Sequence, residues 1–121
     1  MPALGTASKL KMKSLDPRWH PILNEAILYT DFSIIWGFRG EESQNKAYNE
    51  GHSRLKWPES KHNQMPSTAV DLAPYPINWA DVQAFAYLAG VIMTIAAQKQ
   101  TPVIWGGNWT KLKDLGHFEL A

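Results

Sequence analysis

The sequence predicts an α+β domain in which a small, mainly antiparallel sheet is backed by helices. Three observations support this fold class. The elements expected along the chain follow the order α-β-α-loop-β-α-β-β, which suits a sheet with helices packed against it. The length of 121 residues is enough for one core and too short for two. The six tryptophans supply the large side chains that a small core needs.

The first half of the chain is expected to contain an arm, two helices and one strand. Residues 1–13 show no apolar periodicity, so we expect a flexible N-terminal arm followed by a single domain over 14–121. An Asp-Pro pair that resembles a helix start precedes apolar residues at helical spacing, which predicts a helix over 17–30. The β-branched and aromatic segment 32–38 predicts a buried strand, and 41–49 predicts a short helix.

The second half is expected to contain a long loop, one long helix and three strands. The polar segment 51–68 carries two prolines, and long loops in small domains are commonly functional. Residues 69–73 predict a half-apolar strand, and the alanine-rich segment 79–98 predicts the central helix. The last two strands are expected at 102–105 and 116–120.

Composition excludes several classes of protein and site. The formal net charge is +1, from twelve basic and eleven acidic residues, so the overall charge favours neither nucleic acid nor a membrane surface. The absence of cysteine excludes disulfides, thiolate zinc sites and a cysteine nucleophile. The most apolar stretch, 85–97, is too short to cross a bilayer, so we expect no membrane insertion. No secretory signal is visible, so the protein is expected to be made in the cytosol.

Two histidines and one aspartate have the clearest chemistry. His62, Asp71 and His117 provide two imidazoles and one carboxylate, the ligand types that hold a catalytic zinc ion and leave a fourth position open for water. An unpaired carboxylate on a half-apolar strand would be costly to bury, which favours a metal partner for Asp71. Asp114 stands three residues before His117 and is the candidate acid/base. The other two histidines are expected to be ordinary surface or hydrogen-bonded residues: His20 and His52.

Several short motifs together resemble the zinc peptidases of the D-alanyl-D-alanine carboxypeptidase (VanY/VanX) type, and within them the phage endolysins that act as L-alanyl-D-glutamate peptidases. The resemblance runs from about Ser14 to the C-terminus. The motifs are Ser60-x-His62, Ala69-Val70-Asp71-Leu72, Gly37-Phe38-Arg39-Gly40 with Gln44, Trp105-Gly106-Gly107-Asn108-Trp109 and His117-Phe118-Glu119-Leu120. An aspartate at 114, where the carboxypeptidase branch has glutamate, favours the endolysin branch.

The resemblance implies a hedgehog/DD-peptidase-like fold and a role for each matching residue. The residues that match the family's zinc ligands are His62, Asp71 and His117. Asp114 matches the general acid/base, and Arg39 matches the arginine that binds or polarises the substrate. Ser60 and Gln44 are implied to contact the substrate.

We therefore expect a monomeric zinc peptidase that cuts the bond between L-alanine and D-glutamate in peptidoglycan stem peptides. The resemblance implies a phage endolysin that lyses the host, made in the host cytoplasm and released to the cell wall through a holin pore. Three alternatives stay open. They are a D-alanyl-D-alanine carboxypeptidase or dipeptidase, a non-enzymatic zinc-stabilised module that binds peptidoglycan, and a histidine-metal nuclease suggested by Lys61-His62-Asn63. The sequence lacks the stripe of basic residues that a DNA-binding nuclease would need.

Overall fold

A four-stranded sheet forms the centre of the computed structural model, which describes residues 2–111 and 113–121. Its order is β1-β2-β4-β3, and every neighbouring pair is antiparallel. The strands are β1 (Phe32–Trp36), β2 (Ala69–Pro74), β3 (Val103–Trp105) and β4 (His117–Leu120). The α+β class and the antiparallel sheet predicted from the sequence are therefore confirmed.

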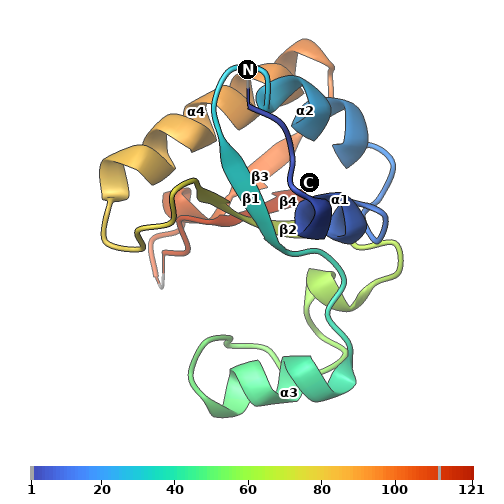
Figure 1. Cartoon of the computed structure of the whole chain (residues 1–121). Coiled ribbons are helices and arrows are strands. Elements are labelled where there is room, and N and C mark those ends of the chain that lie inside the picture. The colour runs from blue at the N-terminus through green and yellow to red at the C-terminus, as the bar shows by residue number, and fades with distance from the viewer. Residues whose placement is uncertain (1, 112) are drawn as a thin grey trace.

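The helices lie on different sides of this sheet. The four α-helices are α1 (Thr6–Met12), α2 (Trp19–Ala26), α3 (Glu41–Asn49) and α4 (Val82–Gln98), and two short 3-10 helices are η1 (Lys61–Asn63) and η2 (Gly106–Asn108). In Figure 1, α2 and α4 lie together over one face of the sheet, whereas α3 stands apart on the opposite side. None of the described helices is both long and apolar enough to span a bilayer.

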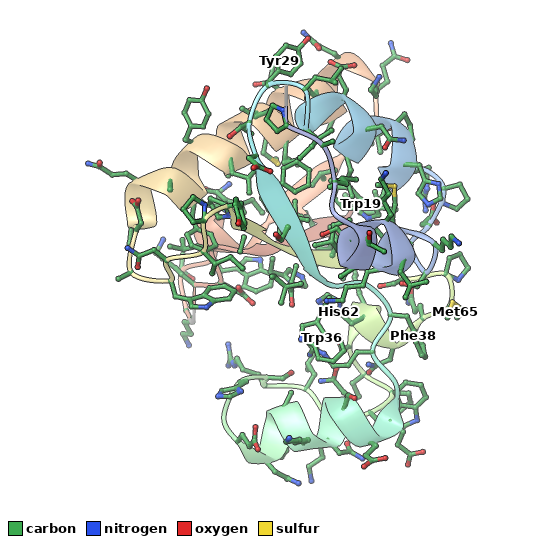
Figure 2. The ribbon with its side chains drawn as sticks, in the orientation of Figure 1. Trp19, Tyr29, Trp36, Phe38, His62 and Met65 are labelled. Carbon is green, nitrogen blue, oxygen red and sulfur yellow. The ribbon has the colours of Figure 1, made fainter. Side chains whose placement is uncertain are left out.

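The hydrophobic core lies between the sheet and the pair α2 and α4. Trp19 is fully buried, and its indole N–H donates to the carbonyl of Thr68, so the one polar atom of the ring has a partner. Figure 2 shows Trp19 inside the molecule, while Tyr29 and Met65 point outward. The core fixes the sheet on one face and leaves the opposite face free to carry polar groups.

The expectation of a flexible arm over residues 1–13 is wrong for the part that forms α1. This helix packs beside β1, with Ser8 and Met12 buried, and Leu4, just before the helix, is buried as well. The Ser8 hydroxyl accepts a hydrogen bond of 2.9 Å from the Ile34 N–H, a donor on the side of β1 that faces no other strand. The helix therefore covers an edge of the sheet, which an exposed strand would otherwise offer to another chain. Only two of its side chains are buried, too few to give an apolar period in the sequence.

Replacing Ser8 with alanine should lower the free energy of unfolding by about 1–3 kcal/mol, because the buried N–H of Ile34 would lose its acceptor. Urea denaturation would measure the change. Thr6→Ala is the matched control, since Thr6 is an exposed residue of the same helix. Equal stability of the two variants would show that α1 is not held by this contact.

Several elements are shorter than the sequence predicts. The helix expected over 17–30 is regular only from Trp19 to Ala26, because hydrogen-bonded turns replace the α-helix at both ends. The helix expected from residue 79 begins after Asp81, whose carboxylate caps it by accepting from the Ala84 N–H at 3.1 Å.

A β-bulge in β1 lies beside the predicted site. The pairing of β1 with β2 shifts between Ile34 and Trp36, so that Trp36 comes opposite Asp71. An extra residue at this point bends the strand, as bulges next to functional sites commonly do. The chain that leaves β1 then runs past Asp71 and brings Gly37 and Arg39 within hydrogen-bond distance of the metal-ligand candidates.

Candidate metal centre and active site

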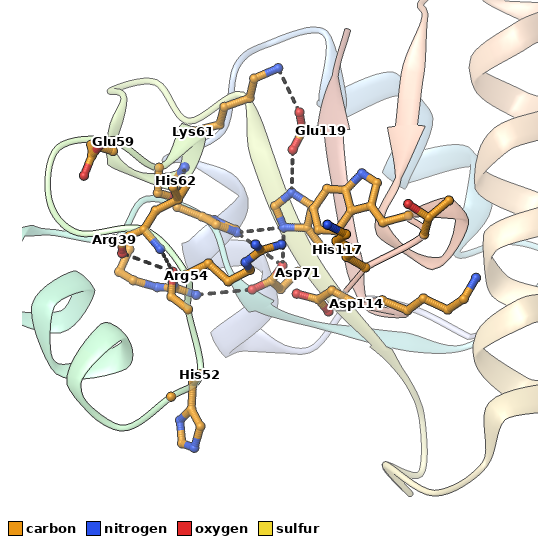
Figure 3. A pocket seen from close by; sticks show the side chains of 18 residues that line it. Arg39, His52, Arg54, Glu59, Lys61, His62, Asp71, Asp114, His117 and Glu119 are labelled. Carbon is orange, nitrogen blue, oxygen red and sulfur yellow. Dashed lines mark hydrogen bonds and ion pairs between the residues drawn. The ribbon is translucent and has the colours of Figure 1, made fainter.

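The three predicted metal ligands meet on one face of the sheet although they are far apart in the sequence. Pairing of β2 with β4 places Asp71 opposite His117, and η1 brings His62 to the same point. The Nε2 atom of His62 lies 3.2 Å from Oδ1 of Asp71 and 3.3 Å from Nδ1 of His117. The Nδ1 atom of His117 lies 3.0 Å from the same Asp71 oxygen. Figure 3 shows the three side chains converging in the cleft.

The orientation of His62 is fixed by its main-chain surroundings. Ser60 caps η1 by accepting a hydrogen bond from the His62 N–H at 3.1 Å. The Nδ1 atom of the ring lies 2.8 Å from the carbonyl of Gly37, which can only accept, so this nitrogen carries the proton. The other nitrogen, Nε2, is then free to direct its lone pair at Asp71 and His117.

The orientation of His117 is fixed by a carboxylate. Its Nε2 atom lies 2.9 Å from Oε1 of Glu119, two residues further along β4 and on the same face of the strand. The Nδ1 atom therefore faces Asp71 and His62. Metal-binding histidines usually donate their second ring N–H to a carboxylate or a carbonyl in this way, which sets the tautomer. The ring of Trp109 packs against that of His117, with 5.1 Å between the centroids.

These donor atoms fit a zinc ion. Two imidazole nitrogens and a carboxylate oxygen lie within 3.0–3.3 Å of one another. Three acceptors at such distances repel one another unless a cation lies between them, and this cation is either a proton or a metal ion. In a tetrahedral zinc site with bonds of about 2.0–2.2 Å, neighbouring donor atoms are about 3.3–3.5 Å apart. The separations in this structure are close to that value, and the donors are of the types that zinc takes.

Hydrogen bonding shifts the pKa values of the charged groups at the centre. For Asp71, burial alone would raise the pKa, but hydrogen bonds to His117 and His62 outweigh it and lower the value far below the ordinary range. For His117, burial alone would lower the pKa, but the bonds to Asp71 and Glu119 raise it to about 9. The hydrogen bond from His117 lowers the pKa of Glu119 to about 2. The centre is therefore built to hold positive charge between two carboxylates.

Arg39 lies beside Asp71. Its Nη2 atom is 3.3 Å from Oδ2 of Asp71, the carboxylate oxygen that does not face the two histidines. Its guanidinium also lies over the ring of Trp36, 4.9 Å from the centroid, and Nε has no hydrogen-bond partner among the described residues. Arg39 lines the cleft, and its contact with the substrate stays a prediction.

Gln44 is not where a substrate contact would have to be. Its side chain is completely buried, and its amide donates to the Ser53 hydroxyl and to the Leu55 carbonyl. Its amide oxygen accepts from Arg39 and Asn63. The prediction that Gln44 contacts the substrate is therefore wrong. Because every polar atom of the side chain is used inside the protein, Gln44 holds Arg39 and the loop after α3 in place.

Asp114 reaches the cleft from the turn before β4. Its N–H donates to the carbonyl of Gly106 at 3.1 Å, and its carbonyl accepts from the His117 N–H at 3.2 Å. A side chain at Gly106 would collide with the Asp114 carbonyl, so only glycine allows η2 to approach this turn so closely. Figure 3 shows the Asp114 carboxylate beside Asp71. Desolvation in the cleft, and then the negative charge of Asp71, raise the pKa of Asp114.

The cleft around these groups extends from the metal-ligand candidates to the loop after α3. Ser60 lines it, and its contact with the substrate stays a prediction. His52 also lines the cleft but does not belong to the group of three metal-ligand candidates. A ring nitrogen of His20 forms a hydrogen bond with the carbonyl of Met12. Basic side chains are prominent in its walls. In addition to Arg39 they are Arg54, Lys61, Lys111 and Lys113.

Two residues at the centre are missing from the set predicted from the sequence. Glu119 holds His117, and Lys61 in turn pairs with Glu119 at 2.9 Å. Glu119 could have been found, because residues two apart on a strand share a face and Glu119 follows His117 at that spacing. Lys61 carries no such signal, since its partner lies 58 positions further along the chain.

Comparison with known proteins agrees with this geometry. The family model described as phage L-alanyl-D-glutamate peptidase matches residues 3–119. Among solved structures, the crystal structure of the Serratia marcescens L-Ala D-Glu endopeptidase ChiX is similar, with a TM-score of 0.84 and 27% sequence identity. The similarity covers 99% of this chain and 91% of that one. Because the family match covers nearly the whole sequence, the chain belongs to the phage L-alanyl-D-glutamate peptidase family.

Proposed function

We propose that this peptidase is zinc-dependent and hydrolyses the bond between L-alanine and D-glutamate in peptidoglycan stem peptides. The observation that carries the zinc proposal is the convergence of two imidazole nitrogens and one carboxylate oxygen within 3.0–3.3 Å. The zinc ligands would be His62, Asp71 and His117. A zinc ion bound there would lower the pKa of a water molecule and polarise the scissile carbonyl.

The other steps use side chains that face the cleft. Asp114 accepts a proton from the attacking water and then donates it to the leaving amine, a role suited by its raised pKa. Arg39 stabilises the negative charge that develops on the carbonyl oxygen, and its contact with Asp71 orients that carboxylate. Ser60 orients the peptide at the edge of η1.

The charge of the cleft walls supports an anionic stem peptide as substrate. Glutamate has two carboxyl groups and a peptide continues through only one, so D-glutamate next to the scissile bond keeps a free carboxylate. Arg54 and Lys111 are exposed in the walls of the cleft, and guanidinium and ammonium groups attract carboxylates. A cleft with these basic side chains therefore suits a peptide that carries a free carboxylate.

Digestion of purified sacculi tests the bond assignment. The zinc-loaded protein is expected to release fragments in which the glycan keeps a terminal L-alanine and the freed peptide begins with D-glutamate. Mass spectrometry of the products measures this, and chelator-treated protein is the control. Release of D-alanine would instead assign a carboxypeptidase or dipeptidase, and the absence of any cleavage by zinc-loaded protein would contradict the enzymatic proposal.

We further propose that the protein is a phage endolysin and acts as a monomer. Membership in a phage peptidase family supports this role. In this proposal the enzyme is made in the host cytoplasm and reaches the cell wall through a holin pore, where its hydrolysis of stem peptides lyses the cell.

A further inference from the structure

Lys61 connects the two segments that carry the histidine ligands. It lies in η1 directly before His62, and its Nζ atom reaches across to β4, the strand of His117. There it lies 2.9 Å from Oε2 of Glu119 and 3.1 Å from the carbonyl of Leu120. The segment η1 is not part of the sheet, so no ladder of backbone hydrogen bonds fixes its distance from β4. The Lys61 side chain supplies a connection that the backbone does not.

Both carboxylate oxygens of Glu119 accept a hydrogen bond. Oε1 accepts from Nε2 of His117 at 2.9 Å, and Oε2 accepts from Nζ of Lys61 at 2.9 Å. Only 16% of the Glu119 side chain is exposed, compared with 40% of the Lys61 side chain. A carboxylate that is mostly shielded from water and held at both oxygens has little freedom to rotate. The rotation of the His117 ring is limited by the same contact.

The two histidines differ in how they are held. The second nitrogen of His62 bonds a main-chain carbonyl, that of Gly37, which no side-chain substitution can remove. The second nitrogen of His117 bonds the side chain of Glu119, whose position depends in turn on Lys61. The orientation of His117 is therefore set by side chains that mutation can change.

We propose that Lys61 and Glu119 form a clamp that orients His117 and holds η1 against β4, which makes both of them positioning residues of the metal centre. The inference rests on the proposed zinc site. Figure 3 shows the chain of contacts from Lys61 through Glu119 to His117, on the side of the imidazole away from Asp71. Neither residue touches the position between the three ligands, so the clamp acts through His117 and not on the substrate.

Zinc affinity measured without substrate tests the clamp. Glu119→Gln should weaken zinc binding about 10–100-fold, the usual effect of losing a partner of a ligating histidine. A glutamine offers one acceptor oxygen, so it cannot accept from His117 and Lys61 at separate oxygens. Lys61→Met should weaken binding about 2–5-fold, as expected for a partly exposed ion pair. Lys61→Arg should recover most of this loss, because it restores the cation. Competition with a chromophoric chelator measures all of these affinities.

A second lysine provides the matched control. Lys99 pairs with Glu25 at 3.0 Å and is partly exposed, but it does not line the cleft. Lys99→Met should leave the zinc affinity unchanged, and the metal-free forms of Lys61→Met and Lys99→Met should have similar unfolding midpoints. Nitrogen-15 NMR of the histidine rings adds a direct readout: the Nε2 proton of His117 should exchange with water faster in Glu119→Gln than in wild type.

Two results would overturn the proposal in different ways. If wild-type protein binds zinc and Glu119→Gln binds it equally well, the clamp is refuted and the zinc site stands. If wild-type protein itself binds no zinc, the zinc site is refuted, and the clamp with it.

Discussion

Replacing Asp114 with asparagine is expected to lower kcat by about 10²–10⁴-fold, the range that a general acid/base contributes. Asparagine has nearly the same shape, so the backbone contacts of the turn with Gly106 and His117 should persist. It cannot take up a proton, so the attacking water would lose its base and the leaving amine its acid. Zinc affinity should change little, because Asp114 is not one of the three converging ligands.

The pH dependence of the same variant provides a second measurement. A general base works only when it is deprotonated, so wild-type kcat/KM should rise with pH as Asp114 loses its proton. Because the pKa of Asp114 is raised, kcat/KM should increase at a higher pH than it would with an ordinary aspartate. The residual activity of Asp114→Asn should not show this increase with pH. Asp81→Asn is the control, since asparagine caps a helix as well as aspartate does. An Asp114→Asn protein that digests sacculi as fast as wild type would assign the acid/base to another residue.

Removal of the metal is expected to abolish hydrolysis without unfolding the protein. The buried apolar cluster between the sheet, α2 and α4 does not include the three ligands, so the core does not depend on them. Circular dichroism should therefore change little on chelation, while product release from sacculi stops. Added zinc should restore activity. Full activity in the chelated protein would contradict the metal-dependent mechanism.

Zinc binding should become tighter as the pH rises toward about 9. In the metal-free protein the bonds to Asp71 and Glu119 raise the pKa of His117 to about 9, so at neutral pH its ring carries an extra proton. Zinc needs the neutral ring and must displace that proton. The apparent affinity should rise about tenfold per pH unit below this value and then level off. Calorimetry in buffers of different ionisation enthalpy would count the released proton. His52→Ala, at the rim of the cleft, should leave this dependence unchanged.

The ligand set illustrates what residue type and local pattern can predict. Two histidines and an aspartate are chemically suited to zinc wherever they meet, and the strand pattern around Asp71 already placed it on a sheet. The structure brings these three side chains together as expected. The roles of Asp114, Arg39 and Ser60 stay predictions, although all three line the same cleft.

Other features depend on contacts between distant segments and have no local signal. Ser8 receives its hydrogen bond from a residue 26 positions away, so a segment without apolar periodicity is nevertheless an ordered helix. Gln44 has the motif position of a substrate contact, yet the loop after α3 folds over it and uses its amide. Neither outcome can be derived from the types of residue in the neighbouring sequence.

The sequence by itself determined the fold class, most of the elements and the metal-ligand candidates, because helical and strand periodicity and ligand chemistry are properties of single residues and their near neighbours. Only the tertiary structure decided that Asp71 faces His117 across two paired strands, that Arg39 bonds Asp71, and that Lys61 reaches Glu119. Strand register and the packing of loops on the sheet set these distances. Both arise from the balance of contacts over the whole chain, which no local pattern contains.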